Sequence, residues 1–153
     1  MKLRWAALAV VLALSVLVSH DLRAQTSEPE KGRTRAQGEL GQNYPNPFDV
    51  DTRIPFVIGT PPECNQPGRL HRVTVRVYNI LLQLIAVPVL QGGGGTVADG
   101  QPLENVLLPC DRYVAYWNGK LLNTSRDAAS GVYIYQLEID GRPVDVKRLR
   151  LVR

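Results

Sequence analysis

The sequence predicts an all-β fold in which two antiparallel sheets pack face to face. Three observations support this prediction. Short apolar stretches with the period of strands follow one another from residue 53 to residue 152. Turn-forming glycine, proline, asparagine and aspartate residues separate these stretches. No helix of normal length is visible after residue 39, and the remaining stretch of about 114 residues has the size of one sandwich domain.

The first two predicted strands show the clearest alternation. Residues 53–58 alternate between apolar and other side chains, and Pro55 points away from the apolar face. Proline has no N–H to donate to a neighbouring strand. Pro55 therefore predicts that this strand lies at an edge of its sheet, where no neighbour needs that N–H. Residues 71–80 form the cleanest strand, and one of its faces consists of valines. These valines are Val73, Val75 and Val77.

Five further strands complete a predicted set of seven. They are expected at residues 81–90, 103–108, 113–117, 132–139 and 144–152. Residues 81–90 are continuously apolar, so we expect this strand to be covered on both faces. Asp140-Gly141 suits a tight hairpin, because both central residues of such a turn have positive φ. The last two strands should therefore be antiparallel neighbours, and seven short strands favour two packed sheets.

An export signal is predicted at residues 1–24. A short basic start precedes an apolar run from Trp5 to Val18, which is shorter than the roughly 20 residues that span a bilayer. Cleavage is expected after Ala24, and retention as a short membrane anchor is the alternative because Leu22 is large for a position so near the cleavage point.

A polar linker is predicted at residues 25–39. This stretch has many charges, one proline and two glycines, and it shows no apolar periodicity. We therefore expect it to be disordered and the folded domain to occupy residues 40–153.

The charge balance does not predict a nucleic-acid partner. The chain has 18 Lys and Arg residues against 14 Asp and Glu. Lys2, Arg4 and Arg23 precede residue 25 together with Asp21, which leaves 15 basic and 13 acidic residues and a net charge of +2. No clustered basic stripe accompanies this small excess.

The two cysteines, Cys64 and Cys110, are predicted to form one disulfide, because disulfides form and persist in exported proteins. Two buried thiols are the alternative. The bond would close a loop of about 47 residues and contribute about 4 kcal/mol to stability by the chain-entropy argument.

Three segments together resemble a known family. The first is Asn43-Tyr44-Pro45-Asn46-Pro47-Phe48, followed by Thr52 to Phe56. The second is Val73 to Asn79. The third pairs Trp117-Asn118-Gly119 with Ala129-Ser130-Gly131-Val132-Tyr133-Ile134-Tyr135. In this order they resemble the immunoglobulin-like domain of the flagellar hook-capping protein, and equally the C-terminal sorting domains of proteins exported by the type IX secretion system. The resemblance covers nearly all of residues 41–153 and implies an immunoglobulin-like sandwich.

The motif residues are expected to have structural roles. Pro45 and Pro47 would hold an extended path, so that Tyr44 and Phe48 fold over an open end of the sandwich. Asn118 and Gly119 would supply a turn after the strand of Trp117. Gly131, next to Val132 and Tyr133, would let the chain turn into the next strand without a Cβ clash.

The chain departs from the family pattern mainly in its loops. Leu82-Gln83 stands where the family often has a glycine, and residues 61–67 and 92–109 are insertions. The sorting domains follow a large passenger, and none is present in this sequence, so a binding role is expected ahead of a sorting role.

No grouping of residues predicts catalysis, a metal or a cofactor. His71 is the only histidine after residue 24 and is expected to be a solvated residue at the start of a strand. Gly92 to Gly95 lacks the Lys-Ser/Thr of a phosphate loop and is expected to be a flexible connection. Asp49 and Asp51 match no calcium-loop spacing, so turn capping is expected there.

The sequence therefore favours a non-enzymatic, exported binding or scaffold subunit of a cell-envelope assembly. Its expected partner is an envelope or membrane protein, with peripheral membrane contact as a further possibility and without a small-molecule substrate. The alternative is a sorting module of the type IX kind. Two surfaces are the candidate partner contacts. They are the apolar residues Leu103, Val106, Leu107 and Leu108, and the basic residues Arg148 and Arg150.

Overall fold

A computed structural model describes residues 38–59, 63–92 and 98–153 of the chain. The predicted signal at residues 1–24 and most of the predicted linker, residues 25–37, lie outside the described residues. Gly38 and Glu39 were expected in the linker, but they belong to a strand that ends at Leu40. The folded unit therefore begins at least two residues earlier than predicted.

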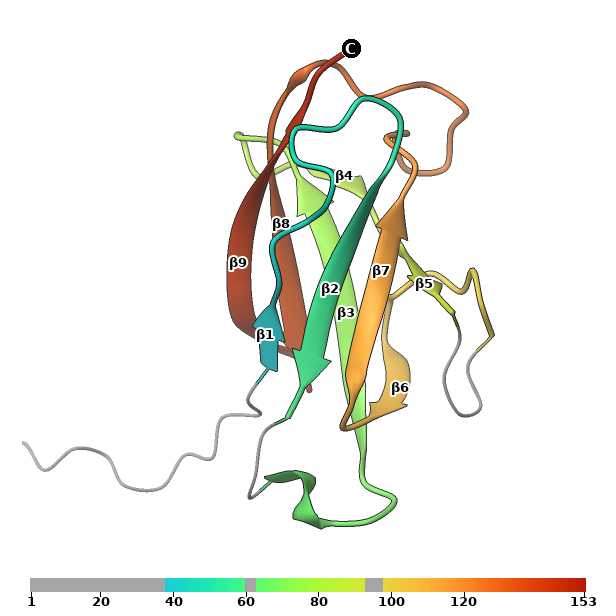
Figure 1. Cartoon of the computed structure of the whole chain (residues 1–153), viewed down its shortest axis with the longest axis vertical. Coiled ribbons are helices and arrows are strands. Elements are labelled where there is room, and N and C mark those ends of the chain that lie inside the picture. The colour runs from blue at the N-terminus through green and yellow to red at the C-terminus, as the bar shows by residue number, and fades with distance from the viewer. Residues whose placement is uncertain (1–37, 60–62, 93–97) are drawn as a thin grey trace, which may run out of the picture. The chain divides into compact units, whose positions relative to one another are not determined.

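The described residues form nine strands in two antiparallel sheets, so the all-β prediction is confirmed and the predicted number of seven strands is too low (Figure 1). The first sheet has the order β1 (Gly38–Leu40), β2 (Thr52–Ile58), β7 (Arg112–Trp117) and β5 (Val89–Gln91). The second has the order β4 (Leu84–Ala86), β3 (Leu70–Tyr78), β8 (Gly131–Ile139) and β9 (Arg142–Leu151), and β6 (Val106–Pro109) also pairs with β3. A single 3-10 turn, Glu63–Asn65, precedes β3.

The core lies between the two sheets and is built from alternate residues of the long strands. On β3 the valines expected on the inner face, Val73, Val75 and Val77, are fully buried. On β7 and β8 the inward side chains include Tyr113, Ala115, Trp117, Tyr135, Leu137 and Ile139. Period-2 alternation therefore located the inward face of β3 correctly.

The stretch from residue 81 to residue 90 is not one strand covered on both faces. It contains the two short strands β4 and β5, which belong to different sheets. The residues before β4 form an exposed turn, in which Leu81 is 73% exposed. A continuous apolar run predicts burial on average, but here a turn at Asn79 interrupts the strand.

Pro55 does not mark an edge strand. Strand β2 lies between β1 and β7, and Pro55 pairs with Val114 of β7. Strand β1 ends opposite Phe56, so the missing N–H of Pro55 faces the point where the neighbouring strand has stopped. The Pro55 carbonyl still accepts a hydrogen bond from Gly41 N–H at 2.7 Å. Proline is tolerated at this position because no partner carbonyl is left without a donor.

The predicted hairpin at Asp140-Gly141 is confirmed. These residues join β8 to β9 and have φ values of 53° and 76°. Both lie in the left-handed region that a two-residue hairpin turn requires. The turn places Asp140 beside the first residues of β3, because Asp140 N–H donates to the Arg72 carbonyl at 2.8 Å.

The opening motif closes one edge of the second sheet. Phe48 pairs in parallel with Leu151 of β9, and the Phe48 N–H donates to the Arg150 carbonyl at 3.0 Å. The Asn46 side chain accepts the Arg150 N–H at 3.0 Å. The Asn43 amide donates to the Pro45 carbonyl at 3.1 Å, which holds the motif in its bent path. The motif therefore satisfies backbone groups that an exposed edge strand would leave open.

The aromatic residues of the motif behave as expected only in part. Phe48 is buried and meets Trp117 edge to face, with ring centroids 5.5 Å apart. Trp117 meets Tyr133 in the same way. Tyr44 was expected to cover the sandwich end, but it is half exposed and contributes through its backbone pairing with Arg53. An extended path was predicted at Pro45 and Pro47. The Tyr44-Pro45 and Asn46-Pro47 peptide bonds are cis.

The turn after β7 follows the prediction, whereas the prediction for Gly131 is wrong. The Asn118 side chain accepts the Lys120 N–H, and Gly119 has a φ of 68°. A Cβ at Gly119 would lie 2.8 Å from the Val50 carbonyl oxygen, so glycine is required there. At Gly131 a Cβ would only make an ordinary contact with the Tyr133 ring, and Val132 beside it is half exposed.

Candidate functional site

The predicted apolar contact surface at residues 103–108 does not exist as a surface. Leu103, Val106 and Leu108 are core residues with exposed fractions of 0%, 4% and 0%. Strand β6 places Leu108 opposite His71 and Val106 opposite Val73, which both face the core. Only Leu107 is exposed. The insertion therefore extends the core, because its alternation matches that of β3.

The second predicted contact, the basic residues of β9, is exposed as expected. Arg148 and Arg150 point outward from the sheet, while Leu149 and Leu151 between and beyond them are buried. Arg150 lies opposite Val132 and Arg148 opposite Ile134 on β8. The two guanidinium groups thus stand on one face of the edge strand, and Lys147 falls on the other face.

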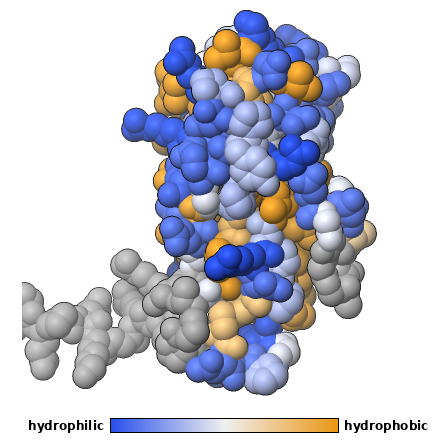
Figure 2. All heavy atoms as spheres, viewed as in Figure 1, coloured by the Kyte–Doolittle hydropathy of each residue, from blue (hydrophilic) through white to orange (hydrophobic). Residues whose placement is uncertain are grey.

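A different apolar surface is present at the turn between β3 and β4. Three consecutive large side chains, Ile80, Leu81 and Leu82, are each about 70% exposed. We call these three residues the apolar turn. Figure 2 shows apolar side chains at the surface near the end of the domain where β3 terminates in Figure 1. Isolated exposed leucines are ordinary, but three in one turn are typical of an interaction site.

The Asn79 side chain holds the apolar turn in one conformation. Its Oδ1 atom accepts the N–H groups of Leu81 and Gln83, both at 2.9 Å. Its Nδ2 atom donates to the Gln83 side chain at 2.7 Å, and its carbonyl accepts the Leu82 N–H at 3.0 Å. The turn is therefore fixed by its own polar atoms, and its apolar side chains are left facing solvent.

Leu82 adopts a backbone conformation that disfavours a side chain. Its φ is 59°, in the left-handed region. This conformation costs about 1–2 kcal/mol for a residue with a Cβ atom, and glycine would avoid the cost. A strained, exposed leucine stabilises neither the turn nor the core. Such residues are found preferentially at functional sites.

A groove begins beside the apolar turn. It has a volume of about 610 Å³ and lies where β4 and β5, the facing edges of the two sheets, meet the loop after β7. Leu84 and Leu122 line it and are each about 40% exposed. The Leu122 N–H donates to the Ile85 carbonyl at 2.7 Å, which ties the loop to β4. The apolar turn and this groove are both candidate docking surfaces, and Leu84 of the groove lies two residues after Leu82.

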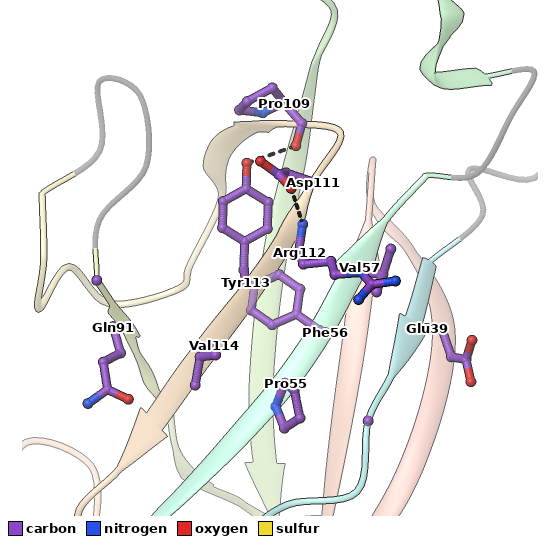
Figure 3. A pocket seen from close by; sticks show the side chains of 12 residues that line it. Glu39, Pro55, Phe56, Val57, Gln91, Pro109, Asp111, Arg112, Tyr113 and Val114 are labelled. Atoms are coloured by element: carbon purple, nitrogen blue, oxygen red, sulfur yellow. Dashed lines mark hydrogen bonds between the residues drawn. The ribbon is translucent and has the colours of Figure 1, made fainter.

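A second hollow, of about 680 Å³, lies on the first sheet (Figure 3). Tyr113 at its floor donates its hydroxyl hydrogen to the Pro109 carbonyl at 3.0 Å. Burial, together with the nearby Asp111 carboxylate, raises the pKa of Tyr113, so its hydroxyl stays protonated and a donor. Glu39 and Gln91 stand at opposite margins of the hollow in Figure 3. Catalysis needs reactive side chains that converge on one point. In Figure 3 the Glu39 side chain lies apart from those of Asp111 and Arg112.

The predicted disulfide is confirmed. Cys64 and Cys110 are bonded, with Cα atoms 5.6 Å apart, and both are partly exposed. Gly59 lies directly beneath the two sulfur atoms at a φ of 72°, and a Cβ there would collide with both. The bond therefore joins the 3-10 turn before β3 to the connection between β6 and β7.

His71 is not a solvated residue, and sequence reasoning missed its environment. Its side chain is 2% exposed, and its Nδ1 atom lies 2.9 Å from Oδ2 of Asp140. Its Nε2 atom lies 3.8 Å from the Cys110 sulfur. The signal was present in the sequence, because His71 lies two residues before Val73 and so continues the inward face of the strand.

The Asp140 carboxylate is held in its charged form. Desolvation raises its pKa, but hydrogen bonds from His71 and from the Arg72 backbone N–H lower it, as does attraction to His71 and Arg69. The lowering influences win, so the pKa of Asp140 lies below its ordinary value. A charged Asp140 accepts a hydrogen from Nδ1 of His71 and thereby sets which ring nitrogen carries a proton.

The remaining predictions concern metal and phosphate sites. In the part of the chain that the structure describes, no three His, Cys, Asp or Glu residues group to hold a metal ion. Asp49 caps the next N–H at 2.9 Å, and Asp51 pairs with Arg53, in keeping with turn roles. Gly92 donates to Asp99, and residues 93–97 lie outside the described residues.

Within residues 38–59, 63–92 and 98–153, the structure contains no helix with the length and apolar character that crossing a membrane requires.

Comparison with known proteins identifies no family. No protein-family model matches the sequence. No curated protein matches it. Among solved structures, the chain is similar to Pseudomonas fluorescens alkylpurine DNA glycosylase AlkC bound to DNA containing an abasic site analog, with a TM-score of 0.45 and 12% sequence identity. The match covers 78% of this chain and 31% of that chain, so this chain spans about a third of that protein. Similarity at this level does not extend to activity.

Proposed function

We propose that this protein is a non-catalytic, exported binding subunit of a cell-envelope assembly, built on an immunoglobulin-like sandwich. The proposal is that it docks through the apolar turn, Ile80 to Leu82, onto an envelope protein that presents an apolar pocket. The observation that carries the proposal is the exposure of these three side chains on a turn that Asn79 fixes.

The turn has the properties of a preformed anchor. It is ordered by five hydrogen bonds from and to Asn79, so little conformational entropy remains to be lost on binding. Side chains that enter a pocket of a partner contribute most of the affinity in protein interfaces. The strain at Leu82 is consistent with selection for an exposed leucine, because the fold itself gains nothing from it.

A protein partner fits the surface better than a lipid bilayer. A groove lined by Leu84 and Leu122 begins two residues after the apolar turn in the chain, and a groove suits a partner of complementary shape. The basic residues Arg148 and Arg150 stand on β9, at the opposite edge of the second sheet from β4. Because Tyr78 pairs with Ile134 and Ile134 with Arg148, these cations nevertheless lie at the same end of the second sheet as the turn, and the vesicle experiment below decides between a protein and a lipid partner.

The test compares two leucine substitutions of the same kind at opposite ends of β3. Leu81→Asp places a charge in the apolar turn, and Leu70→Asp does so at a residue that is 49% exposed at the start of β3. In gently solubilised envelopes of the host, the wild-type protein and Leu70→Asp should migrate with one larger complex. Leu81→Asp should migrate as a free monomer with unchanged circular dichroism.

Three outcomes would overturn the proposal. The first is a wild-type protein that migrates as a free monomer, and the second is a Leu81→Asp variant that stays in the complex. The third is purified wild-type protein that sediments with protein-free anionic vesicles while Leu81→Asp does not, because the partner would then be lipid.

A further inference from the structure

We infer that the Cys64–Cys110 disulfide is a thiol–disulfide exchange site in which His71 and Asp140 stabilise Cys110 as the leaving thiolate. The co-reactant is a small or protein thiol. This inference rests on a cluster at the start of β3, whereas the apolar turn lies at the other end of the same strand.

The geometry aligns three groups in a row. Asp140 Oδ2 lies 2.9 Å from His71 Nδ1, and His71 Nε2 lies 3.8 Å from the Cys110 sulfur. His71 is buried, so its ring cannot turn to water for a hydrogen bond. Asp140 is fixed in turn, because its other oxygen accepts the Arg72 N–H at 2.9 Å. A carboxylate, an imidazole and a sulfur in this order resemble the arrangement that activates thiols in other proteins.

The protonation of His71 favours a thiolate at Cys110. Because the Asp140 carboxylate only accepts hydrogen bonds, Nδ1 carries a hydrogen. In a neutral ring Nε2 would then carry a buried lone pair without a hydrogen. Among the described residues, the polar atom that lies beside Nε2 is the sulfur of Cys110. A disulfide sulfur has no hydrogen to offer, whereas a thiolate accepts the N–H of the charged imidazolium. The site therefore suits the reduced form of Cys110 better than the oxidised one.

The other sulfur has the opposite environment. Cys64 Sγ lies 3.7 Å from the Ile58 carbonyl oxygen, which is an acceptor and disfavours a thiolate nearby. When the bond opens, Cys64 is thus better suited to hold a proton or a new sulfur partner, and Cys110 to hold the negative charge. The arrangement gives the exchange a direction.

The reaction proceeds as two displacements. The thiol RSH ionises, its thiolate RS⁻ attacks Cys64 Sγ, a new RS–S bond forms, and the Cys64–Cys110 bond breaks. The electron pair leaves on Cys110 Sγ, and the proton that RSH released charges Nε2 of His71, which donates to this sulfur. A second thiolate then attacks the sulfur of R and releases the Cys64 thiolate, which takes up the proton of the second thiol. Two thiols are oxidised to RSSR, and the protein disulfide gains two electrons and becomes the Cys64 thiol and the Cys110 thiolate beside the His71 imidazolium.

The experiment compares the purified wild-type chain with the variant His71→Asn. His71→Asn keeps a side-chain N–H for Asp140 but removes the group beside Cys110. Reduction of the wild-type disulfide by glutathione should be about tenfold faster than that of His71→Asn, since the leaving Cys110 thiolate loses its charged hydrogen-bond donor in the variant. Mass spectrometry of the trapped mixed disulfide should place glutathione on Cys64.

A second measurement isolates Cys110 and does not depend on the stability of the disulfide. In Cys64→Ser, the Cys110 thiolate should be visible by ultraviolet absorbance at neutral pH, and it should be lost in Cys64→Ser with His71→Asn and reduced in Cys64→Ser with Asp140→Asn. Glutathione on Cys110, equal reduction rates, or an equal thiolate signal with and without His71 would each overturn the inference. None of these outcomes bears on docking, which the apolar turn variants test separately.

Discussion

The Nδ1 atom of His71 lies 2.9 Å from Oδ2 of Asp140, although 69 residues separate them in the chain. This contact joins the start of β3 to the hairpin between β8 and β9. Asp140 also accepts the Arg72 N–H at 2.9 Å and donates its own N–H to the Arg72 carbonyl at 2.8 Å. Three hydrogen bonds therefore hold this end of the second sheet together.

The Asp140 contact makes stability depend on pH in acid. The pKa of Asp140 is lower in the folded protein than its ordinary value, so the unfolded chain takes up this proton at a higher pH. Its stabilisation is present above about pH 4 and is lost as the pH falls through the lower folded value. Urea unfolding from pH 6 downward should show a loss of stability that Asp140→Asn reduces. An equal acid dependence in the variant would show that other carboxylates are responsible.

Two adjacent leucines on β6 should respond very differently to truncation. Leu108 is fully buried, and Leu108→Ala should cost about 2–5 kcal/mol of unfolding free energy through the cavity it leaves. Leu107 is half exposed, and Leu107→Ala should change stability by less than about 0.5 kcal/mol. Denaturant titration of both variants measures the difference. Similar values for the two would mean that β6 does not have this register with β3.

Tyr135 should contribute to stability through its hydroxyl group. This buried hydroxyl donates to the Gly41 carbonyl at 2.9 Å and accepts the Asn43 N–H at 3.2 Å. Tyr135→Phe leaves the buried Asn43 N–H and the partly buried Gly41 carbonyl without this partner and should cost about 1–3 kcal/mol. Tyr44→Phe is the control, because Tyr44 is half exposed, and it should be near neutral. If Tyr135→Phe is also neutral, the opening motif is not held by this contact.

Leu82 should show opposite effects on stability and on docking. Leu82→Asn replaces a leucine at φ 59° by a residue that tolerates the left-handed region, so it should stabilise the fold by about 1 kcal/mol. It also removes one of three apolar side chains and should weaken docking. Thermal unfolding and binding to the partner test the two effects. A variant that is destabilised, or that docks unchanged, would contradict a functional role for the strain.

The strands with regular alternation could be predicted from sequence, and the short ones could not. Repeated valines on β3 identified its inner face because the period of 2 persists over nine residues. Strand β1 has three residues and a single buried leucine, Leu40, so it carries no periodic signal. Ile80 was assigned to the end of the preceding strand, and Leu81 and Leu82 to a strand covered on both faces, since composition alone does not show where Asn79 turns the chain.

The sites were harder to predict than the strands, because they depend on contacts between distant segments. The disulfide was predicted from the cysteine count and from the predicted export signal. Leu103, Val106 and Leu108 were assigned to the surface because an insertion was expected to exceed the core. His71 was judged alone, and only the pairing of β3 with β6 and the hairpin at Asp140 bring it to Cys110.

Site-specific photo-crosslinking at the apolar turn tests the docking proposal most directly. A photoreactive residue at position 81, in cells, should give one dominant adduct with an identified envelope protein, and the same residue at position 70 should not. The purified partner should then bind the wild-type protein, and Leu81→Asp should bind it at least about tenfold more weakly. Adducts of equal yield from both positions, or none from position 81, would contradict docking through Ile80 to Leu82.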